Sequence, residues 1–380
     1  MPALEGCILT PAGFVHGRLH HGSRIESVRG EPVDEPAARA LAAAGVPLVL
    51  PGFVDLHVHG GAGRDTMEGG DAAAAIARLH ARHGTTALAA TTMTAPRAEI
   101  ESALAALAPH VAARPAGGAR VLGVHLEGPL LNRARLGAQP DFTATATVED
   151  VLALHAIAPL VLVTIAPELP GHLELIVALR ARGFVVQVGH TDASYEQAHA
   201  AFAAGATGVT HLFNAMSPLH QRAPGVVGAA LAHAERAEII PDLLHVHPGA
   251  IRAALRAIPG LYCVTDSTAA AGMPDGSYRL GRHRVTKCLG GVRLPDGTLA
   301  GSTLTMDQAL RNLVGLGLGL AEASRRTATI AAEHLGLADR GRLVPGAWAD
   351  AVVLDAQLVL QEVRVEGERV SPDGEPARGD

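Results

Sequence analysis

Apolar and polar positions follow two different rhythms along this chain, and the rhythm changes near residue 48. Residues 1–49 contain short strand-like runs such as ILT and VPLVL, separated by turns and by an acidic, alanine-rich stretch. From Leu48 onward, β-branched or leucine-rich runs alternate with alanine-rich stretches of helical length. This alternation indicates a parallel sheet whose strands are joined by crossover helices.

The strand-like runs after residue 48 decide which kind of parallel sheet is expected. Eight of them can be counted at positions able to carry chemistry: FVDLHVH, TALAATT, LGVHLEG, VLVTIAP, VVQVGH, GVTHLFN, LLHVH and YCVTD. Eight such strands with helices between them predict an α/β fold, a (β/α)8 TIM-like barrel over residues 50–340, rather than an open sheet.

Strand patterns return after Gly341, in RLVPGAWADAVVLDAQLVLQEVRVEGERV. Both ends of the chain are therefore rich in strand patterns, and they flank the barrel. We expect residues 1–49 and 341–380 to form one small β-sandwich domain. Its last residues, about 371–380 with the sequence SPDGEPARGD, have the composition of a disordered tail.

Composition and charge exclude several kinds of partner. The 380 residues include 48% hydrophobic and 18% charged residues, with a net charge of −6 and no block of like charge. The chain has no basic patch of the kind that would predict binding to nucleic acid or to an anionic membrane surface. No apolar run reaches the roughly 18 residues of a membrane span, and the N-terminus lacks a secretory signal pattern. The 3 scattered cysteines form no disulfide or zinc pattern, which favours the cytoplasm.

Candidate chemistry lies at the carboxyl ends of the predicted strands, where barrel enzymes place their working residues. Residues two apart on a strand face the same side, so the imidazoles of His57 and His59 can converge on one ion. Imidazoles and carboxylates suit zinc or iron, and bound zinc lowers the pKa of its water to about 7. The candidate residues at strand ends are His57, His59, Glu127, His190, His211 and Asp266, with His245 ending another strand.

Chance must be weighed against this interpretation, because the chain has 20 histidines. A single histidine at a strand end is more often hydrogen bonded than bound to a metal. An ordered set of imidazoles and carboxylates on five strands is much harder to obtain by chance. His247 forms a second HxH with His245, but it directly precedes Pro248 and stays outside the predicted ligand set. We interpret most other histidines as surface or loop residues, including His16, His20, His21, His80, His83, His110, His155, His199, His233 and His334.

The motif PGFVDLHVHGG, followed by a glutamate, two histidines and an aspartate at later strand ends, resembles the amidohydrolase superfamily. Within it, six blocks are similar to the N-acetylglucosamine-6-phosphate deacetylase family, and the resemblance runs from about residue 48 to 346. These blocks are GVHLEGPLLN, VGHTDAS, THLFNAMSPL, RAPGVVG, VTDSTAAAG and GTLAGSTLTMDQALRNL.

The single lysine of the chain supports this branch of the superfamily. Ring-amide hydrolases of the superfamily bridge two metals with a carboxylated lysine on a middle strand. Lys287 lies in RHRVTKCLGG, after the strand of Asp266, in what is predicted to be an inserted hairpin. It cannot fill the bridging position, and Glu127 occupies that region instead.

The resemblance implies an activity and a metal. The family hydrolyses the linear N-acetyl amide of N-acetyl-D-glucosamine 6-phosphate with a metal-activated water, and Asp266 would serve as general base and then as general acid. Glu127, His190 and His211 would hold the primary divalent metal, zinc or iron. His57 and His59 would hold a second ion bridged by Glu127, so the sequence leaves one or two ions per subunit open.

The resemblance also implies contacts to the sugar phosphate. Asn214 and Ala215 would bind it through a side-chain amide and backbone N–H groups, together with His245 and Arg222. In the family this arginine reaches the neighbouring subunit's site, which predicts a homodimer. Two departures lie near the expected sugar pocket. Gln139, which is included among the expected substrate contacts, replaces the usual histidine, and Leu243 stands where glycine is common.

Alternative functions remain open at this point. The enzyme could act on N-acetylgalactosamine 6-phosphate or on another N-acyl amino sugar, because the motifs do not separate the epimers. A hydrolase of cyclic amides is disfavoured by the missing bridging lysine, and one of amino-acid amides by the phosphate contacts Arg222 and Asn214. A barrel that serves only for binding is disfavoured because the ligand set and Asp266 are complete.

Overall fold

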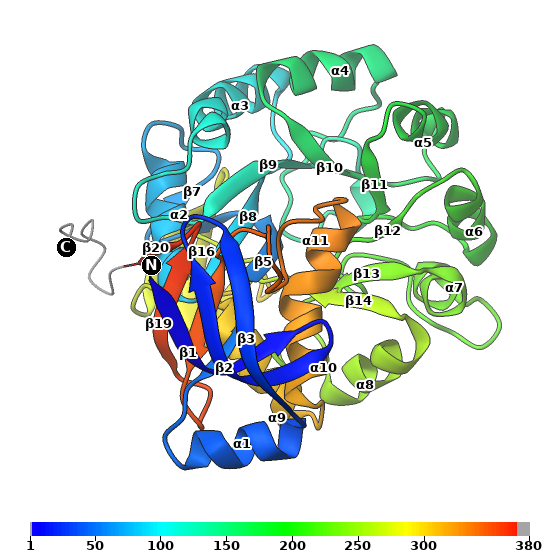
Figure 1. The fold of residues 1–380 in the computed structure, drawn as a ribbon. Coiled ribbons are helices and arrows are strands. Elements are labelled where there is room, and N and C mark those ends of the chain that lie inside the picture. Colours follow the sequence, from blue (N-terminus) through cyan, green and yellow to red (C-terminus); the bar gives the residue numbers. More distant parts are fainter. Residues whose placement is uncertain (1, 371–380) are drawn as a thin grey trace.

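The computed structural model describes residues 2–370, so the predicted disordered tail at 371–380 lies outside the described residues. Its main part is a curled parallel sheet surrounded by helices (Figure 1). The sheet strands follow each other in the order of the sequence: β5 (Phe53–Val58), β8 (Thr85–Thr91), β9 (Arg120–Glu127), β10 (Leu160–Ile165), β11 (Val185–Val188), β12 (Gly208–Val209), β13 (Arg236–Ile239) and β14 (Gly260–Cys263).

Backbone hydrogen bonds at two junctions close this sheet into a barrel. Between β12 and β13, the amide of Leu212 donates to the carbonyl of Glu238 at 2.9 Å. Between the end of β14 and β5, the amide of Asp266 donates to the carbonyl of His57 at 2.9 Å. The predicted (β/α)8 barrel is therefore confirmed.

Helices cover the outside of the barrel, and several begin at side chains that cap their first amides. Thr147 and Asp150 form a capping box at α4, and Ser194 and Gln197 form another at α6. The helices are α2 (Ala72–Arg82), α3 (Arg97–Ala112), α4 (Val148–Ile157), α5 (His172–Arg180), α6 (Tyr195–Ala203), α7 (Gly225–His233), α8 (Pro248–Ala257), α9 (Met306–Gly315), and α10 (Leu320–Ser324), which continues through the π-helical turn η2 (Arg325–Thr329) into α11 (Ile330–His334).

The seventh barrel strand lies earlier in the sequence than predicted. Its residues are Arg236–Ile239, whereas the run LLHVH is an irregular loop. Pro241 cannot donate a ladder hydrogen bond, and the carboxylate of Asp242 accepts from the amides of Leu244 (2.9 Å) and His245 (2.8 Å). This turn ends the strand, so the prediction that His245 ends a strand is wrong.

The two ends of the chain build one hydrogen-bonded sheet of seven strands beside the barrel. In Figure 1 the blue strands of the N-terminus lie next to the red strands of the C-terminus. The sheet order is β20 (Glu368–Arg369), β19 (Leu360–Val365), β18 (Ala351–Leu354), β4 (Leu48–Pro51), β1 (Ala3–Thr10), β2 (Gly13–His21) and β3 (Ile25–Val33), and the helix α1 (Glu35–Ala43) follows β3.

Charged side chains connect this terminal sheet to the barrel. The guanidinium of Arg340 pairs with Asp350 and with Glu366, each at 2.5 Å. Arg120 at the start of β9 binds the same Glu366 at 2.8 Å. Because Arg340 and Asp350 are buried, these ion pairs are protected from solvent screening. They hold the terminal sheet against the first residue of β9.

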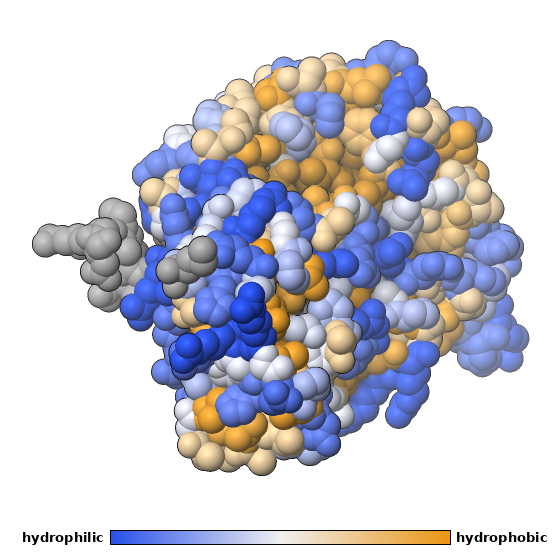
Figure 2. Space-filling view, viewed as in Figure 1, coloured by the Kyte–Doolittle hydropathy of each residue, from blue (hydrophilic) through white to orange (hydrophobic). Residues whose placement is uncertain are grey.

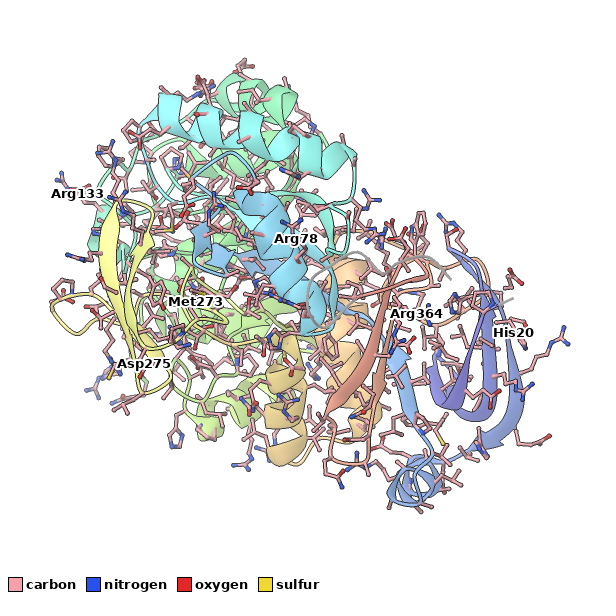
Figure 3. All side chains as sticks on the ribbon, turned by 90° about the vertical axis from the view of Figure 1, so that its left-hand side faces the viewer. His20, Arg78, Arg133, Met273, Asp275 and Arg364 are labelled. Atoms are coloured by element: carbon pink, nitrogen blue, oxygen red, sulfur yellow. The ribbon has the colours of Figure 1, made fainter. Side chains whose placement is uncertain are left out.

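A small antiparallel sheet is inserted after β14, as predicted for the segment around Lys287. It consists of β15 (Gly276–Leu280), β16 (His283–Cys288) and β17 (Gly291–Arg293). In Figure 3 these strands lie at the side of the molecule opposite His20 and Arg364 of the terminal sheet, with Met273 and Asp275 at their base. The Lys287 ammonium donates to the carbonyls of Ala270 (3.3 Å) and Met273 (2.5 Å), which ties the insertion to the loop after Asp266.

The surface is mostly polar over the terminal sheet, whereas apolar residues gather in a hollow over β9 and β10 (Figure 2). This hollow lies at the amino ends of the strands, where Leu122, Leu160 and Val185 line it. No helix within residues 2–370 is long and apolar enough to cross a membrane.

Three histidines that were predicted to be surface or loop residues are buried. His80 is fully buried against the barrel, where its Nε2 lies 3.1 Å from the Gly60 carbonyl. His334 is buried between Tyr262 and Thr207, and His21 lies inside the terminal sheet. The prediction is wrong for these residues because their side chains pack into the interior, where His80 and His334 lie against the barrel and His21 lies within the terminal sheet.

Candidate metal centre and active site

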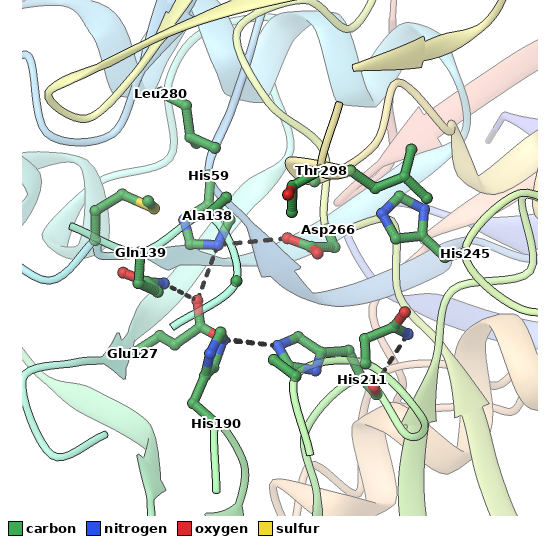
Figure 4. Close-up of a pocket in the computed structure, with 16 residues that line it drawn as sticks. His59, Glu127, Ala138, Gln139, His190, His211, His245, Asp266, Leu280 and Thr298 are labelled. Carbon is green, nitrogen blue, oxygen red and sulfur yellow. Dashed lines mark hydrogen bonds and ion pairs between the residues drawn. The ribbon is translucent and has the colours of Figure 1, made fainter. Parts of the chain in front are cut away.

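A pocket of about 230 Å³ opens at the carboxyl ends of the barrel strands (Figure 4). Its bottom is formed by the side chains predicted from the strand ends, and its walls come from loops after β9, β12 and the inserted sheet. The lining includes His59, Glu127, Gln139, His190, His211, Asn214, Ala215, His245, Asp266, Thr298 and Gly301.

Glu127 lies at the centre of this pocket, and each of its two carboxylate oxygens faces a different pair of imidazoles. Oε1 lies 3.1 Å from Nε2 of His190 and 3.1 Å from Nε2 of His211. Oε2 lies 3.1 Å from Nε2 of His59 and 3.4 Å from Nε2 of His57. The carboxylate therefore stands between two pairs of imidazoles, as a bridging ligand does.

Asp266 is placed beside the pair formed by His57 and His59. Its Oδ1 lies 3.4 Å from Nε2 of His59 and 3.5 Å from Nε2 of His57 (Figure 4 shows the contact to His59). Its side chain is 12% exposed, the largest value among these groups, so Asp266 is the member of the cluster that is most open to the pocket. This position is suited to a group that exchanges protons with a bound molecule.

The donor atoms of this cluster fit a divalent cation. Nε2 atoms of His57 and His59 are 3.1 Å apart, and those of His190 and His211 are 3.0 Å apart. Two uncharged imidazole nitrogens that face each other this closely need a shared proton or a shared cation. Zinc and iron are bound by such sets of imidazole and carboxylate, and all five side chains are buried.

A buried glutamate that was not among the predicted site residues supports the cluster from below. Glu238 on β13 is fully buried, and its Oε2 lies 2.9 Å from Nδ1 of His57. One feature of the sequence indicates such a residue. A lone carboxylate inside the apolar run AEII needs hydrogen-bond partners when the strand is buried. The predicted seventh strand, LLHVH, leaves this run outside the barrel, whereas the structure places it on β13.

The charges of the cluster shift the pKa values of its members. Burial alone would raise the pKa of Glu238, but the charge and hydrogen bond of His57 hold it down at about 2. Burial disfavours the charged form of His57, but the carboxylates of Glu127, Asp266 and Glu238 outweigh it and raise its pKa well above the usual value. A metal cation competes with this proton for the same Nε2 atom.

Backbone strain marks the same residues. His190, His211 and Asp266 have φ values of 46°, 29° and 48°, in the left-handed region that side chains rarely adopt. Each such residue costs of the order of 1–3 kcal/mol, and these conformations gather at functional sites. Each is the residue at which the chain leaves a barrel strand, so the strained turn aims its side chain into the mouth of the barrel.

Gln139 lies in the pocket, but its amide is already engaged. Its Nε2 donates to Oε2 of Glu127 at 2.7 Å, and its Oε1 accepts from the amide of Thr94 at 2.7 Å. It is 5% exposed. The structure thus places Gln139 on the bridging carboxylate, and its role as a substrate contact stays a prediction.

The residues predicted to bind the sugar phosphate fall into two groups. Asn214, Ala215 and His245 line the pocket, and Nδ1 of His245 is held 2.6 Å from the carboxylate of Asp242. Arg222 is exposed in the loop before α7 and does not line this pocket. Within one chain, therefore, the structure does not bring Arg222 together with the other predicted contacts.

Comparison with known proteins adds relatives of the whole chain. Residues 48–375 match the model of the amidohydrolase family. The N-acetylglucosamine-6-phosphate deacetylase of Lysinibacillus sphaericus is 38% identical over 322 residues, covering 83% of each chain. The N-acetylgalactosamine-6-phosphate deacetylase of Escherichia coli O157:H7 is 39% identical over 346 residues, covering 89% of this chain and 91% of that protein.

Solved structures show the same similarity in three dimensions. One is a mutant N-acetyl-D-glucosamine-6-phosphate deacetylase from Mycobacterium smegmatis in complex with N-acetyl-D-glucosamine-6-phosphate. It is 34% identical and has a TM-score of 0.87, covering 96% of this chain and 98% of that chain. The N-acetylglucosamine-6-phosphate deacetylase from Thermotoga maritima is 30% identical with a TM-score of 0.88, covering 97% of this chain and 99% of that chain.

Proposed function

The chain belongs to the amidohydrolase family, among its N-acetylhexosamine-6-phosphate deacetylases, and we propose that its substrate is N-acetyl-D-glucosamine 6-phosphate. Hydrolysis of the N-acetyl group gives glucosamine 6-phosphate and acetate, a step of amino-sugar metabolism. The observation that carries the proposal is the convergence of the buried ligand cluster and Asp266 at the bottom of one pocket.

The cluster provides ligands for one or two divalent cations, zinc or iron. Glu127, His190 and His211 would hold the first ion, and His57 and His59 would hold a second ion with the other oxygen of Glu127. When bound, such an ion supplies Lewis-acid activation of the acyl carbonyl and of the attacking water.

Asp266 carries the protons of the reaction in this proposal. It takes a proton from the water whose oxygen attacks the acetyl carbonyl carbon. It then delivers that proton to the amide nitrogen, because an amine leaves poorly unless it is protonated. The carbon–nitrogen bond breaks, and acetate and the free amino sugar are released. The exposed edge of Asp266 on the pocket side is consistent with both transfers.

The rim of the pocket would bind the sugar phosphate. His245, Asn214 and Ala215 line the pocket, and Ala215 would contribute its backbone N–H group. Arg222 supports the proposal of a homodimer, because a guanidinium suits phosphate but this one lies outside the pocket of its own chain. A second copy would bring its Arg222 to this rim.

The choice between sugar epimers is the finer part of the proposal. Relatives of both kinds are similarly close to this chain, at 38% and 39% identity. The test is acetate release from the glucosamine and galactosamine substrates, compared as kcat/KM. We expect the glucosamine epimer to be preferred, and a higher kcat/KM for the galactosamine epimer would move the assignment to that substrate.

Metal dependence is tested on the same assay. The enzyme is stripped with a chelator, its metal content is measured, and zinc or iron is added back. We expect activity to disappear on stripping and to return with a divalent ion. Full turnover by protein verified to be free of metal would contradict the proposed reaction.

A further inference from the structure

Glu238 receives hydrogen bonds on both of its carboxylate oxygens at the centre of the barrel. Oε2 lies 2.9 Å from Nδ1 of His57 and accepts from the backbone amide of His211 at 3.1 Å. Oε1 accepts from the amide nitrogen of Gln187 and from the hydroxyl of Tyr262, each at 3.3 Å. Glu238 and these neighbouring groups are buried, so no water replaces these contacts.

These hydrogen bonds to Glu238 determine which ring nitrogen of His57 carries a proton. A carboxylate that meets three N–H or O–H donors is an acceptor, so its remaining neighbour, Nδ1 of His57, must donate. Nε2 of His57 is then left with a free lone pair in the neutral ring, directed at His59 and at Oε2 of Glu127. This is the tautomer that a metal ligand needs.

The other three histidines of the cluster have no such partner. Nδ1 of His190 lies 2.8 Å from the carbonyl of Arg135. Among residues 2–370, Nδ1 of His59 and Nδ1 of His211 have no hydrogen-bond partner. His57 is therefore the histidine of the cluster whose Nδ1 is held by a charged group.

The same oxygen also reaches the other pair of ligands. Oε2 of Glu238 accepts the amide of His211, whose backbone is in the strained left-handed region. One carboxylate oxygen thus holds the ring of His57 and the backbone of His211, which lie on the two sides of the bridging Glu127.

We propose that Glu238 is a positioning residue that makes His57 a metal ligand and joins the two pairs of histidines into one centre. The proposal rests on the metal-dependent function proposed above. Without the carboxylate, the His57 ring can place its proton on Nε2, in the space between His59 and Glu127 that a cation would fill. The residue does not touch the pocket, so it acts through His57 and not on the substrate.

Metal retention by the purified full-length protein tests this inference. Wild type and Glu238→Gln are dialysed against a graded series of chelator, and zinc per chain is measured by elemental analysis. Outer partners of metal-bound histidines contribute about 10–100-fold to metal affinity. We therefore expect Glu238→Gln to lose its zinc at a chelator concentration lower by that factor.

Tyr262→Phe is the matched control. It removes the hydroxyl that binds Oε1 and disturbs the same buried network, but it leaves the contacts of Oε2 to His57 and His211 in place. We expect its zinc retention to stay within about threefold of wild type. Equal losses in both variants would mean general disruption of the core and would overturn the inference.

A double substitution separates a role through His57 from an independent one. In a His57→Gln background, Glu238→Gln should reduce zinc retention by a smaller factor than it does in wild type, because only its contact to the His211 amide is left to lose. Two full, multiplying losses would overturn the inference. If thermal denaturation shows that Glu238→Gln is not folded, Glu238→Asp is used in its place. The shorter side chain of aspartate keeps the charge but withdraws the carboxylate from His57.

The outcomes also separate this inference from the proposed function. A protein that retains zinc as described but releases no acetate leaves the inference standing and contradicts only the proposed substrate. A wild-type protein that retains no divalent metal overturns both. Unchanged retention in Glu238→Gln overturns the inference while the deacetylase function remains.

Discussion

The bottom of the pocket and its rim differ in how much of their geometry one chain provides. At the bottom, Glu127 and four histidines are buried, and their donor atoms meet at 3.0–3.4 Å. At the rim, His245 and Asn214 line the pocket, but Arg222 stands exposed and apart from them. One chain brings together all the residues at the bottom of the pocket. At the rim, one chain has residue types suited to phosphate, but it does not bring Arg222 together with His245 and Asn214.

Substitutions in the two regions should therefore have different kinds of effect. Buried groups with several contacts each are held by the fold, so their loss should affect the metal or the rate of the chemical step. Exposed groups on loops act on the part of the substrate that does not react, so their loss should affect binding. The predictions below test this division, beginning with the largest effect.

Replacement of Asp266 should have the largest effect on the rate. Asp266→Asn keeps the shape but removes the proton carrier, so we expect kcat to fall by about 10²–10⁴-fold with KM nearly unchanged. Steady-state kinetics of acetate release and zinc per chain check this. A kcat within threefold of wild type would show that the bottom of the pocket does not work through this residue.

Acid should lower the free energy of unfolding, because the folded protein keeps some buried histidines neutral. Burial lowers the pKa of His334 from its usual 6.5 to about 4. The unfolded chain therefore binds more protons between pH 6.5 and pH 4, so stability is complete above pH 6.5 and falls as pH decreases through this window. The loss from this histidine amounts to about 3 kcal/mol at the acid end.

His334→Gln isolates this contribution. Denaturant unfolding at several pH values should show a shallower loss of stability toward acid for the variant than for wild type, while buried His80 still titrates in both. His16→Gln, at an exposed position in the terminal sheet, controls for replacing a histidine. Identical pH dependence in His334→Gln and wild type would contradict the prediction.

Replacement of Arg222 should act on binding alone. Losing a hydrogen-bonded charge pair to phosphate costs about 1.5–3 kcal/mol, so Arg222→Ala should raise KM by roughly 10–100-fold with little change in kcat. Turnover of the sugar without phosphate should not change. Arg222→Lys keeps the charge but not the planar fork, and it should fall between the two.

Mixed dimers reveal which subunit uses this arginine. At a substrate concentration well below the wild-type KM, subunits with Arg222→Ala and subunits with Asp266→Asn should each show little activity. A dimer of the two would contain one site with an intact Asp266 and the partner's intact arginine. Activity recovered on mixing and refolding supports an arginine that crosses between subunits. No recovery in a verified mixed dimer would place Arg222 in its own chain's site.

The smallest expected effect concerns strain at the rim. Leu243 adopts φ 65° with 39% of its surface exposed, a conformation that glycine reaches without strain. Leu243→Gly should therefore raise the free energy of unfolding by about 0.5–1 kcal/mol, after allowance for the greater freedom of glycine in the unfolded chain. A lower denaturation midpoint would show that the leucine side chain stabilises the rim by contacts that outweigh the strain.

Most barrel strands could be predicted because each is a short apolar run bounded by turn residues. The seventh could not, since LLHVH has the pattern of a strand and only the turn made by Pro241 and Asp242 excludes it. Because the seventh strand was predicted at LLHVH, Glu238 on β13 was not predicted as a site residue. Its neighbours Gln187 and Tyr262 come from other strands. Contacts of that kind leave no pattern in the local sequence.

The residue types and chain order of the candidate ligands could be predicted from the sequence, because each stands at the end of a recognisable strand and parallel strands end at one edge of a barrel. The folded barrel was needed to show which oxygen of Glu127 faces which pair of histidines and which nitrogen of His57 contacts Glu238. The two-residue period along a strand determines which face of the sheet a side chain occupies, but the distances between side chains on different strands are set only when the barrel closes.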